Sequence, residues 1–291
     1  MTPELSPSHA LPHDADQALL IGRVWQPGTG PVLVQVRPEG VYDLSALAST
    51  CSELLDRSDC ATAVRAHQGA RLGDVASVLA NSDPHYRRED QPWLLAPCDL
   101  QALKAAGVTF VASMLERVIE EQARGDASKA AAVRAAVVAI MGDNLSLVKP
   151  GSEQAAQLKQ ALLDQGAWSQ YLEVGIGPDA EVFTKSQPMS AVGTGAEVGL
   201  HPRSEWNNPE PEIVLVVNSR GDVVGATLGN DVNLRDFEGR SALLLGKAKD
   251  NNGSCAVGPF IRLFDAQFGI DHVRRCDLSM EVRGTDGFVM Q

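Results

Sequence analysis

Two glutamates, Glu210 and Glu212, stand two residues apart at the start of the apolar run 213–217. In a β-strand, residues two apart point to the same side, so both carboxylates face one space. Residues 216–224 form a hairpin signal whose turn centres near Arg220. Folding about that point lays residues 228–230 opposite 212–210. Asp231 then arrives beside the pair, and three carboxylates converge.

These three side chains predict a metal site. Adjacent like charges are costly unless a cation neutralises them or one of them stays protonated. An oxygen-only set of ligands is typical of a hard divalent cation, so we expect Mg²⁺, and Mn²⁺ and Ca²⁺ are compatible with the same oxygens. The alternative is that Glu-x-Glu on an exposed edge strand forms a solvated face. Both interpretations stay open at this point.

The composition narrows the class of protein. The chain has 291 residues, enough for one large domain or two smaller ones, and 44% of them are hydrophobic. A net charge of -12 argues against non-specific nucleic-acid binding and against anionic membrane surfaces. An anionic substrate would therefore need local cations. A bound metal together with Lys185, Arg235 and Lys249 would provide them.

The cysteines and the N-terminal segment indicate a cytoplasmic protein. The 5 cysteines have no metal-ligand or redox spacing, so we expect free thiols in a reducing compartment. No apolar run approaches the roughly 20 residues of a membrane span. The first residues lack the basic and apolar regions of a secretion signal, and residues 1–17 are expected to be a disordered tail.

The periodicity of apolar residues changes along the chain. Residues 18–48 predict strands, residues 45–65 include a short helical stretch, and the polar, proline-rich loop 81–97 closes an N-terminal domain of residues 18–95. Residues 99–165 predict helices from apolar residues at helical spacing. From Tyr171 onward the pattern predicts strands. Residues 96–291 are therefore expected to form a catalytic domain with a helical insert.

Other candidate motifs give weaker predictions. The spaced glycines of 189–199 lack a following helix, so turns explain them better than a dinucleotide site. The chain has no P-loop and no Gly-x-Ser-x-Gly sequence, and its 6 histidines are scattered. Lys249 and Lys185 each have a surface interpretation, since most lysines are solvated. Glu116 is equally compatible with a carboxylate on a helix surface.

Together these segments resemble the fumarylacetoacetate hydrolase superfamily. The resemblance lies in a Glu-x-Glu strand, an Asn-Asp-x-x-x-Arg-Asp, a lysine six residues before the cysteine that starts Cys-x-x-Gly-Pro, and a Phe-x-Lys strand. In this chain they are Glu210 and Glu212, Asn230-Asp231 with Arg235-Asp236, Lys249 before Cys255, and Phe183-Thr184-Lys185. The resemblance implies an α+β fold: a β-roll-like catalytic domain with a smaller N-terminal β-rich domain. It also implies a divalent cation on the three carboxylates and a 2-oxo acid substrate.

One departure from that family concerns the reaction. Its hydrolases often carry Gly-x-Asn-Tyr-x-x-His-x-x-Glu where this chain has residues 107–116, so Ser113 replaces the histidine that helps to activate water, and Glu116 is retained. Without that base, hydrolysis of a carbon–carbon bond loses its water activator, whereas a dehydration does not need one.

Residues 103–110, 168–174, 206–212 and 229–246 are similar to the 2-keto-3-deoxy-D-pentonate dehydratases. These act on arabinonate or xylonate derivatives in pentose degradation, and the similarity implies a homo-oligomer. Those relatives continue for about a hundred residues more, so we expect a C-terminally truncated chain. The alternatives are a hydrolase of an acylpyruvate or fumarylacetoacetate-like acid, or an inactive interaction or assembly protein.

The dehydratase hypothesis gives each candidate residue a role. Lys249 is the candidate for abstracting the C3 proton, since a neighbouring cation would lower its pKa. Glu116 would protonate the departing C4 hydroxyl, and Lys185, Arg235 and Ser113 are candidate substrate contacts. For Arg235, a structural role that stabilises the loop around Asp231 is an equally weighted alternative.

Overall fold

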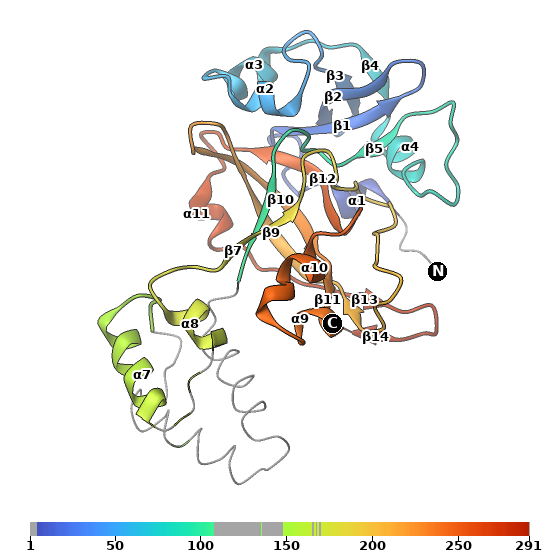
Figure 1. The fold of residues 1–291 in the computed structure, drawn as a ribbon. Helices are drawn as coiled ribbons and strands as arrows, with labels where there is room; N and C mark the ends of the chain where they lie inside the picture. Colours follow the sequence, from blue (N-terminus) through green and yellow to red (C-terminus); the bar gives the residue numbers. More distant parts are fainter. Residues whose placement is uncertain are drawn as a thin grey trace. The chain divides into compact units, whose positions relative to one another are not determined.

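The computed structural model describes residues 5–107, 135, 148–164, 166, 168 and 170–290 (Figure 1). The chain divides into two compact units, one formed by residues 1–103 with 184–291 and the other by residues 104–183. The boundary expected near residue 95 falls inside the first unit, because strands from both sides of it join one sheet. The compact units therefore differ from the expected division into residues 18–95 and 96–291.

Eight strands of the first unit form an antiparallel sheet, in the order β4-β3-β2-β1-β12-β10-β9, with β5 also paired to β1. Their bounds are β1 Leu20–Gln26, β2 Gly30–Arg37, β3 Gly40–Asp43, β4 Arg71–Gly73, β5 Trp93–Leu95, β9 Pro211–Val217, β10 Val223–Asp231 and β12 Cys255–Leu263. Among the described strands, β9 lies at an edge of this sheet.

Shorter elements complete the described chain. The strand pairs are β6 Leu103–Ala106 with β7 Val182–Ser186, β8 Asn207–Asn208 with β11 Asn233–Leu234, and β13 Val282–Arg283 with β14 Val289–Met290. The helices are α1 Pro7–Ala10, α2 Cys51–Leu55, α3 Cys60–Ala66, α4 Val75–Ala80, α7 Glu153–Asp164, α8 Gln170–Ile176, α9 Arg235–Glu238, α10 Leu245–Lys249 and α11 Ile270–Val273, with a 3₁₀ turn at Ala242–Leu244.

Alternation along β1 and β2 builds a core on each face of the sheet. Leu19, Ile21 and Leu33 point to one face, where they pack against the leucines of α2 and Val64 of α3. The intervening residues, among them Leu20 and Val34, point to the other face, where they pack against α4, β5 and Phe260. Because both faces of the sheet are covered, the sequences of these strands are nearly continuous apolar runs.

Residues 104–183 form the second unit, and its described part contains α7 and α8. Ala155, Leu158 and Leu162 recur at helical spacing on α7 and are all buried. Lys159 Nζ lies 2.6 Å from Glu173 Oε2 and joins α7 to α8. None of the described helices is long and apolar enough to cross a membrane.

The structure confirms some element predictions and corrects others. The helical stretch expected within 45–65 is α2 and α3. Within 99–165, α7 confirms a helix, but residues 103–106 form strand β6 instead. The expectation of strands from Tyr171 is wrong, because residues 170–176 form α8 and the next strand begins at Val182. The loop expected over 81–97 contains β5, which pairs with β1. The predicted helical residues 110–119 lie outside the described residues.

Residues 5–17 are packed, in contrast to the expected disordered tail. They include α1, and Leu5, Ala10 and Leu11 pack against the core beneath α4. Asp14 Oδ1 accepts a hydrogen bond of 2.8 Å from Arg262 Nη1, which lies on β12. The sequence pattern missed this packing because the segment has few apolar residues.

A buried aspartate connects the segment after β5 to the start of α2. Asp99 accepts hydrogen bonds from the backbone N–H groups of Cys51 at 2.6 Å and Ser52 at 3.1 Å, which are the first residues of α2. Arg23 Nε lies 3.6 Å from Asp99 Oδ2, and both side chains are buried. Arg23 also donates to the carbonyl oxygens of Ala96 and Cys98. Asp99 therefore caps a distant helix and neutralises a buried guanidinium.

We expect Asp99→Ala to lower the free energy of unfolding by about 3 to 5 kcal/mol, because it leaves the buried Arg23 without its counter-ion. Asp74→Ala is the matched control, since Asp74 caps α4 at an exposed position by accepting from Ser77 N at 2.8 Å. That control should lose about 1 kcal/mol. Urea unfolding of both variants measures the difference, and equal losses would contradict the role of the buried ion pair.

Candidate active site

One extra residue in β10 sets the position of Asp231. Near the turn the hairpin pairs Val223 with Val217, as a turn centred on Arg220 predicts. The register then shifts between Val223 and Gly225, so that Gly229 pairs with Glu212 and Asp231 N donates to Glu210 O at 2.9 Å. The expected pairing of residues 228–230 with 212–210 is therefore wrong by one residue.

This shift decides which face Asp231 occupies. Residues directly opposite each other in an antiparallel pair point to the same side of the sheet, and a one-residue slip reverses that side. Without the bulge at Val224, Asn230 would lie opposite Glu210, and Asp231 would point to the other face. With the bulge, Asp231 shares a face with both Glu210 and Glu212, and Gly229, which has no side chain, lies opposite Glu212.

Glu210 is held by its backbone and its carboxylate. Its N–H donates to Asn230 Oδ1 at 2.9 Å, and its Oε1 accepts from Asn233 Nδ2 at 2.9 Å. Its Oε2 lies 2.5 Å from Lys249 Nζ. Burial alone would raise the pKa of Glu210, but the hydrogen bond and charge of Lys249 lower it below its ordinary value. Glu210 is therefore an ionised carboxylate in a fixed position.

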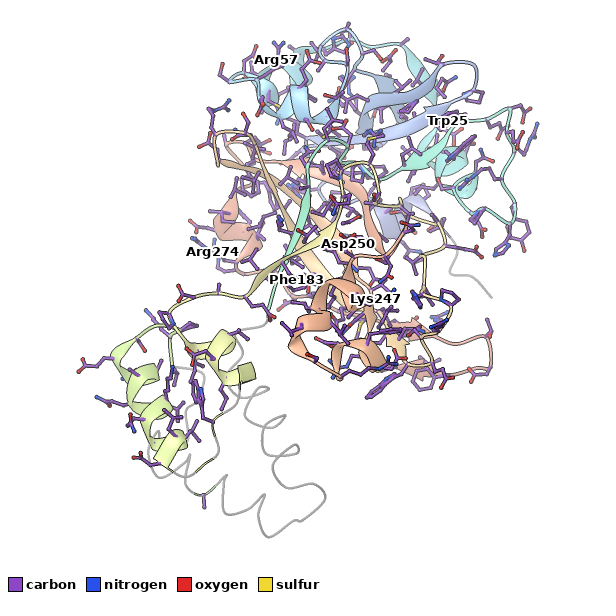
Figure 2. The ribbon with its side chains drawn as sticks, in the orientation of Figure 1. Trp25, Arg57, Phe183, Lys247, Asp250 and Arg274 are labelled. Atoms are coloured by element: carbon purple, nitrogen blue, oxygen red, sulfur yellow. The ribbon has the colours of Figure 1, made fainter. Side chains whose placement is uncertain are left out.

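Lys249, the last residue of α10, joins two of the three carboxylates (Figure 2 labels its neighbours Lys247 and Asp250). Its ammonium lies 2.5 Å from Glu210 Oε2 and 2.9 Å from Asp231 Oδ2, and its side chain is 4% exposed. Burial alone would lower its pKa, but the charge of Asp231 and the hydrogen bond to Glu210 raise it. Lys249 is therefore a buried ammonium in this arrangement, and the surface interpretation is wrong.

Lys185 is a second buried lysine beside Asp231. Its Nζ donates to Val232 O at 2.8 Å and to Lys249 O at 2.5 Å, and it lies 3.3 Å from Asp231 Oδ1. Only 2% of the residue is exposed, so its surface interpretation is wrong as well. Burial lowers the pKa of Lys185, although the charge of Asp231 opposes the shift. These contacts position the backbone that carries Asp231 and Lys249.

Glu212 is the third carboxylate of the group and differs from Glu210. Burial and the charge of Asp231 raise the pKa of Glu212, while Lys249 partly offsets them. The two glutamates therefore have opposite pKa shifts although they lie two residues apart, because Lys249 bonds directly to Glu210. Glu212 is the carboxylate whose negative charge is least well compensated.

The donor chemistry of this group fits a hard divalent cation. Asp231 Oδ1 is buried and accepts no hydrogen bond from the described residues. Its nearest cation among the contacts described is Lys185 Nζ, 3.3 Å away, and a carboxylate oxygen next to two glutamates is the type of ligand that Mg²⁺ prefers. Among the described residues, however, no three His, Cys, Asp or Glu side chains are grouped closely enough to hold an ion. Lys249 contacts Glu210 and Asp231 instead, so the metal-ligand assignment stays a prediction.

The remaining predicted site residues have different outcomes. Arg235 Nη1 lies 2.7 Å from Glu238 Oε2, and its guanidinium carbon lies 5.8 Å from the ring centroid of Trp206. These contacts hold Arg235 against its own helix α9 and Trp206, so both predicted roles, the substrate contact and the brace of the Asp231 loop, stay predictions. Ser113 and Glu116 lie outside the described residues, so their assigned roles stay predictions.

The sequence analysis missed two polar residues of this group. Asn233 is fully buried and donates to Glu210, and Ser254 Oγ donates to Lys249 O at 2.8 Å. Asn233 follows Asp231 by two residues, so strand alternation places both on one side. That spacing is the signal that could have identified it. Ser254 lies in a loop, and the sequence carries no comparable signal for it.

Known proteins resemble this chain in sequence and in fold. No family model matches the chain. The chain is 38% identical over 110 residues to the probable 2-keto-3-deoxyxylonate dehydratase of Haloferax volcanii, covering 38% of this chain and 36% of that protein. It is 41% identical over 81 residues to the 2-dehydro-3-deoxy-D-arabinonate dehydratase of Saccharolobus solfataricus, covering 28% and 27%. The matches thus span about a third of each curated relative.

The fold is of the fumarylacetoacetate hydrolase type, as the motifs predicted, and its elements are those of an α+β protein. A 2-keto-3-deoxy-D-arabinonate dehydratase complexed with magnesium and 2,5-dioxopentanoate matches with a TM-score of 0.54 at 20% identity. Its apo form matches with a TM-score of 0.55. Both matches cover 84% of this chain and 66% of the other chain. The predicted resemblance to pentonate dehydratases is confirmed.

We expect Lys185→Met to lower the free energy of unfolding by about 3 kcal/mol in metal-free buffer, because Asp231 loses a buried counter-ion. Lys247→Met is the control, since Lys247 is exposed on the same helix as Lys249. It should change stability by less than about 0.5 kcal/mol. Urea unfolding with a chelator present measures both. A stable Lys185→Met protein would show that this lysine does not hold the site together.

Proposed function

We propose that the chain catalyses the metal-dependent dehydration of a 2-keto-3-deoxy-D-pentonate, the arabinonate or xylonate, to 2,5-dioxopentanoate. Glu210, Glu212 and Asp231 would hold Mg²⁺. The observation that carries the proposal is three carboxylates on one sheet face beside two buried lysines. It is supported by the dehydratase names of both curated relatives and by a fold neighbour complexed with magnesium and 2,5-dioxopentanoate.

The charges of the group support a divalent cation together with an anionic substrate. Three carboxylates and the ammonium groups of Lys185 and Lys249 leave one net negative charge when all are ionised. A divalent cation reverses that to one positive charge, and the carboxylate of a 2-oxo acid then neutralises the group. Charge neutrality matters here, because an uncompensated charge in a buried site costs several kcal/mol. The overall charge of -12 makes this local compensation necessary for an anionic ligand.

Glu210, Glu212 and Asp231 would hold the cation, which would supply a Lewis acid for the 2-oxo acid. Its charge would offset the carboxylates that raise the pKa of Lys249. Lys249 would first release its ammonium proton to solvent, and the neutral amine at Nζ would then accept the C3 proton. The electron pair of that C–H bond forms the C3–C4 double bond as the C4–O bond breaks. Glu116 protonates the departing hydroxyl, which leaves as water, and the unsaturated acid tautomerises to 2,5-dioxopentanoate.

The other predicted residues have supporting roles in this proposal. Lys185 holds the Asp231 and Lys249 backbone in place through its buried contacts, rather than by meeting the substrate. Arg235 braces α9 through Glu238. Ser113 would contact the substrate, and a serine in place of the histidine disfavours hydrolysis. A homo-oligomer in the cytoplasm stays a prediction of the same resemblance.

We expect the purified protein with Mg²⁺ and 2-keto-3-deoxy-D-xylonate or -arabinonate to form the semialdehyde, measured through a coupled dehydrogenase. Chelation of the metal should abolish the reaction. Glu212→Gln should lower kcat/KM by about a hundredfold or more, because it removes a charged metal ligand. Glu205→Gln is the control, since Glu205 is exposed in the same segment, and it should keep wild-type activity.

Three outcomes would contradict the proposal. Release of pyruvate from acylpyruvates, without semialdehyde from the pentonates, would indicate the hydrolase. A fully active Glu212→Gln protein would remove the metal-ligand assignment. Absence of Mg²⁺ and oxalate binding in calorimetry would favour an inactive interaction protein, because oxalate mimics the enolate of a 2-oxo acid.

A further inference from the structure

The amide of Asn233 bridges two carboxylates in the interior. The residue is 0% exposed. Its Nδ2 donates to Glu210 Oε1 at 2.9 Å and to Glu238 Oε2 at 2.7 Å. An amide nitrogen carries two hydrogens, so both donors are used. Two carboxylate acceptors admit only this orientation of the amide, because a carbonyl oxygen turned toward them would meet two negative charges.

The oxygen of the same amide has no partner among the described residues. A buried carbonyl oxygen without a hydrogen bond destabilises the folded state. A purely structural residue at this position would be an apolar side chain of similar size, which carries no such cost. The nitrogen, with its two hydrogen bonds to carboxylates, is therefore the part of Asn233 that the fold uses.

Asn233 extends a chain of contacts from Glu210 to α9. Glu238 Oε2, which accepts from Asn233, also accepts from Arg235 Nη1 at 2.7 Å. Arg235 is half-buried, so its charge holds the Glu238 carboxylate in place. The orientation of Asn233 is thereby set on one side by an ion pair and on the other by Glu210.

The backbone around Asn233 is fixed as well. Asn233 begins β11 and pairs with Asn208 of β8, which leads into Glu210. The next residue, Leu234, packs with Phe237 of α9 and Ala248 of α10 in a small core. The residue thus has little freedom, and its amide can limit the motion of the flexible Glu210 side chain.

We propose that Asn233 is a positioning residue that restricts the carboxylate of Glu210, one of the three proposed Mg²⁺ ligands; this rests on the proposed function. A flexible glutamate side chain loses rotamer freedom when it is fixed. Asn233 and Lys249 each fix one oxygen of Glu210 before a cation arrives. If the cation displaces Lys249 from Glu210, Asn233 still holds the carboxylate.

The test is the affinity of the purified chain for Mg²⁺ alone, measured by calorimetry. Asn233→Leu keeps a similar volume and removes the donor. We expect its Kd for Mg²⁺ to rise about 10- to 100-fold, as for other residues that orient metal ligands. Asn233→Ser, which keeps one polar donor, should show a smaller rise. Melting temperatures recorded with increasing Mg²⁺ give an independent readout, since binding to the folded state raises them.

Asn218→Leu is the matched control. Asn218 is a buried asparagine at the turn end of the same hairpin, and its Oδ1 accepts from Arg220 N and Asp222 N. It should lower the melting temperature and leave the Kd for Mg²⁺ within about twofold, because additivity holds for distant sites.

The outcomes separate the positioning role from the proposed function. Wild-type Mg²⁺ affinity in Asn233→Leu, or in Asn233→Ser if the leucine variant does not fold, overturns the positioning role and leaves the dehydratase proposal standing. A wild-type chain that binds no Mg²⁺ overturns both. An equal rise in Kd for Asn218→Leu would assign the effect to general destabilisation and overturn the positioning role.

Discussion

The extra residue in β10 is the constraint on which the candidate active site depends. Val224 lies between two registers of the β9–β10 hairpin and packs its side chain against the core on the α2–α3 face. The bulge therefore has a packing reason of its own. Its consequence appears seven residues further on, where Asp231 joins Glu210 and Glu212 on one face instead of pointing away.

Three neighbouring carboxylates repel one another unless positive charge compensates them, and two buried lysines supply that charge. Lys249 contacts Glu210 and Asp231, and Lys185 lies beside Asp231 while donating to the carbonyl oxygen of Lys249. The lysines therefore stabilise each other's positions as well as the carboxylates. In this arrangement Asp231 Oδ1 accepts no hydrogen bond from the described residues, and the negative charge of Glu212 is the least compensated of the three. A bound cation would supply a partner for Asp231 Oδ1 and positive charge beside Glu212.

Short elements around the sheet position several side chains of this site. β8, β11, α9 and α10 are 2 to 5 residues long, yet they present Asn233, Glu238 and Lys249. Such short segments have little intrinsic stability. They are ordered by a shared core of Leu234, Phe237 and Ala248 and by hydrogen bonds between their polar side chains. Packing and site geometry therefore depend on the same few residues.

The sequence by itself determined the identity of the carboxylates, the hairpin between them and the resemblance to pentonate dehydratases, because alternation, turn residues and motif spacing are local properties. It did not determine the register, since a bulge arises from packing against strands distant in sequence. Nor did it reveal that Lys185 and Lys249 are buried, because their burial depends on carboxylate and backbone carbonyl partners 18 to 64 residues away. Only the tertiary structure brought Asn233 between Glu210 and Glu238, since that contact requires the hairpin and α9 to be in place together.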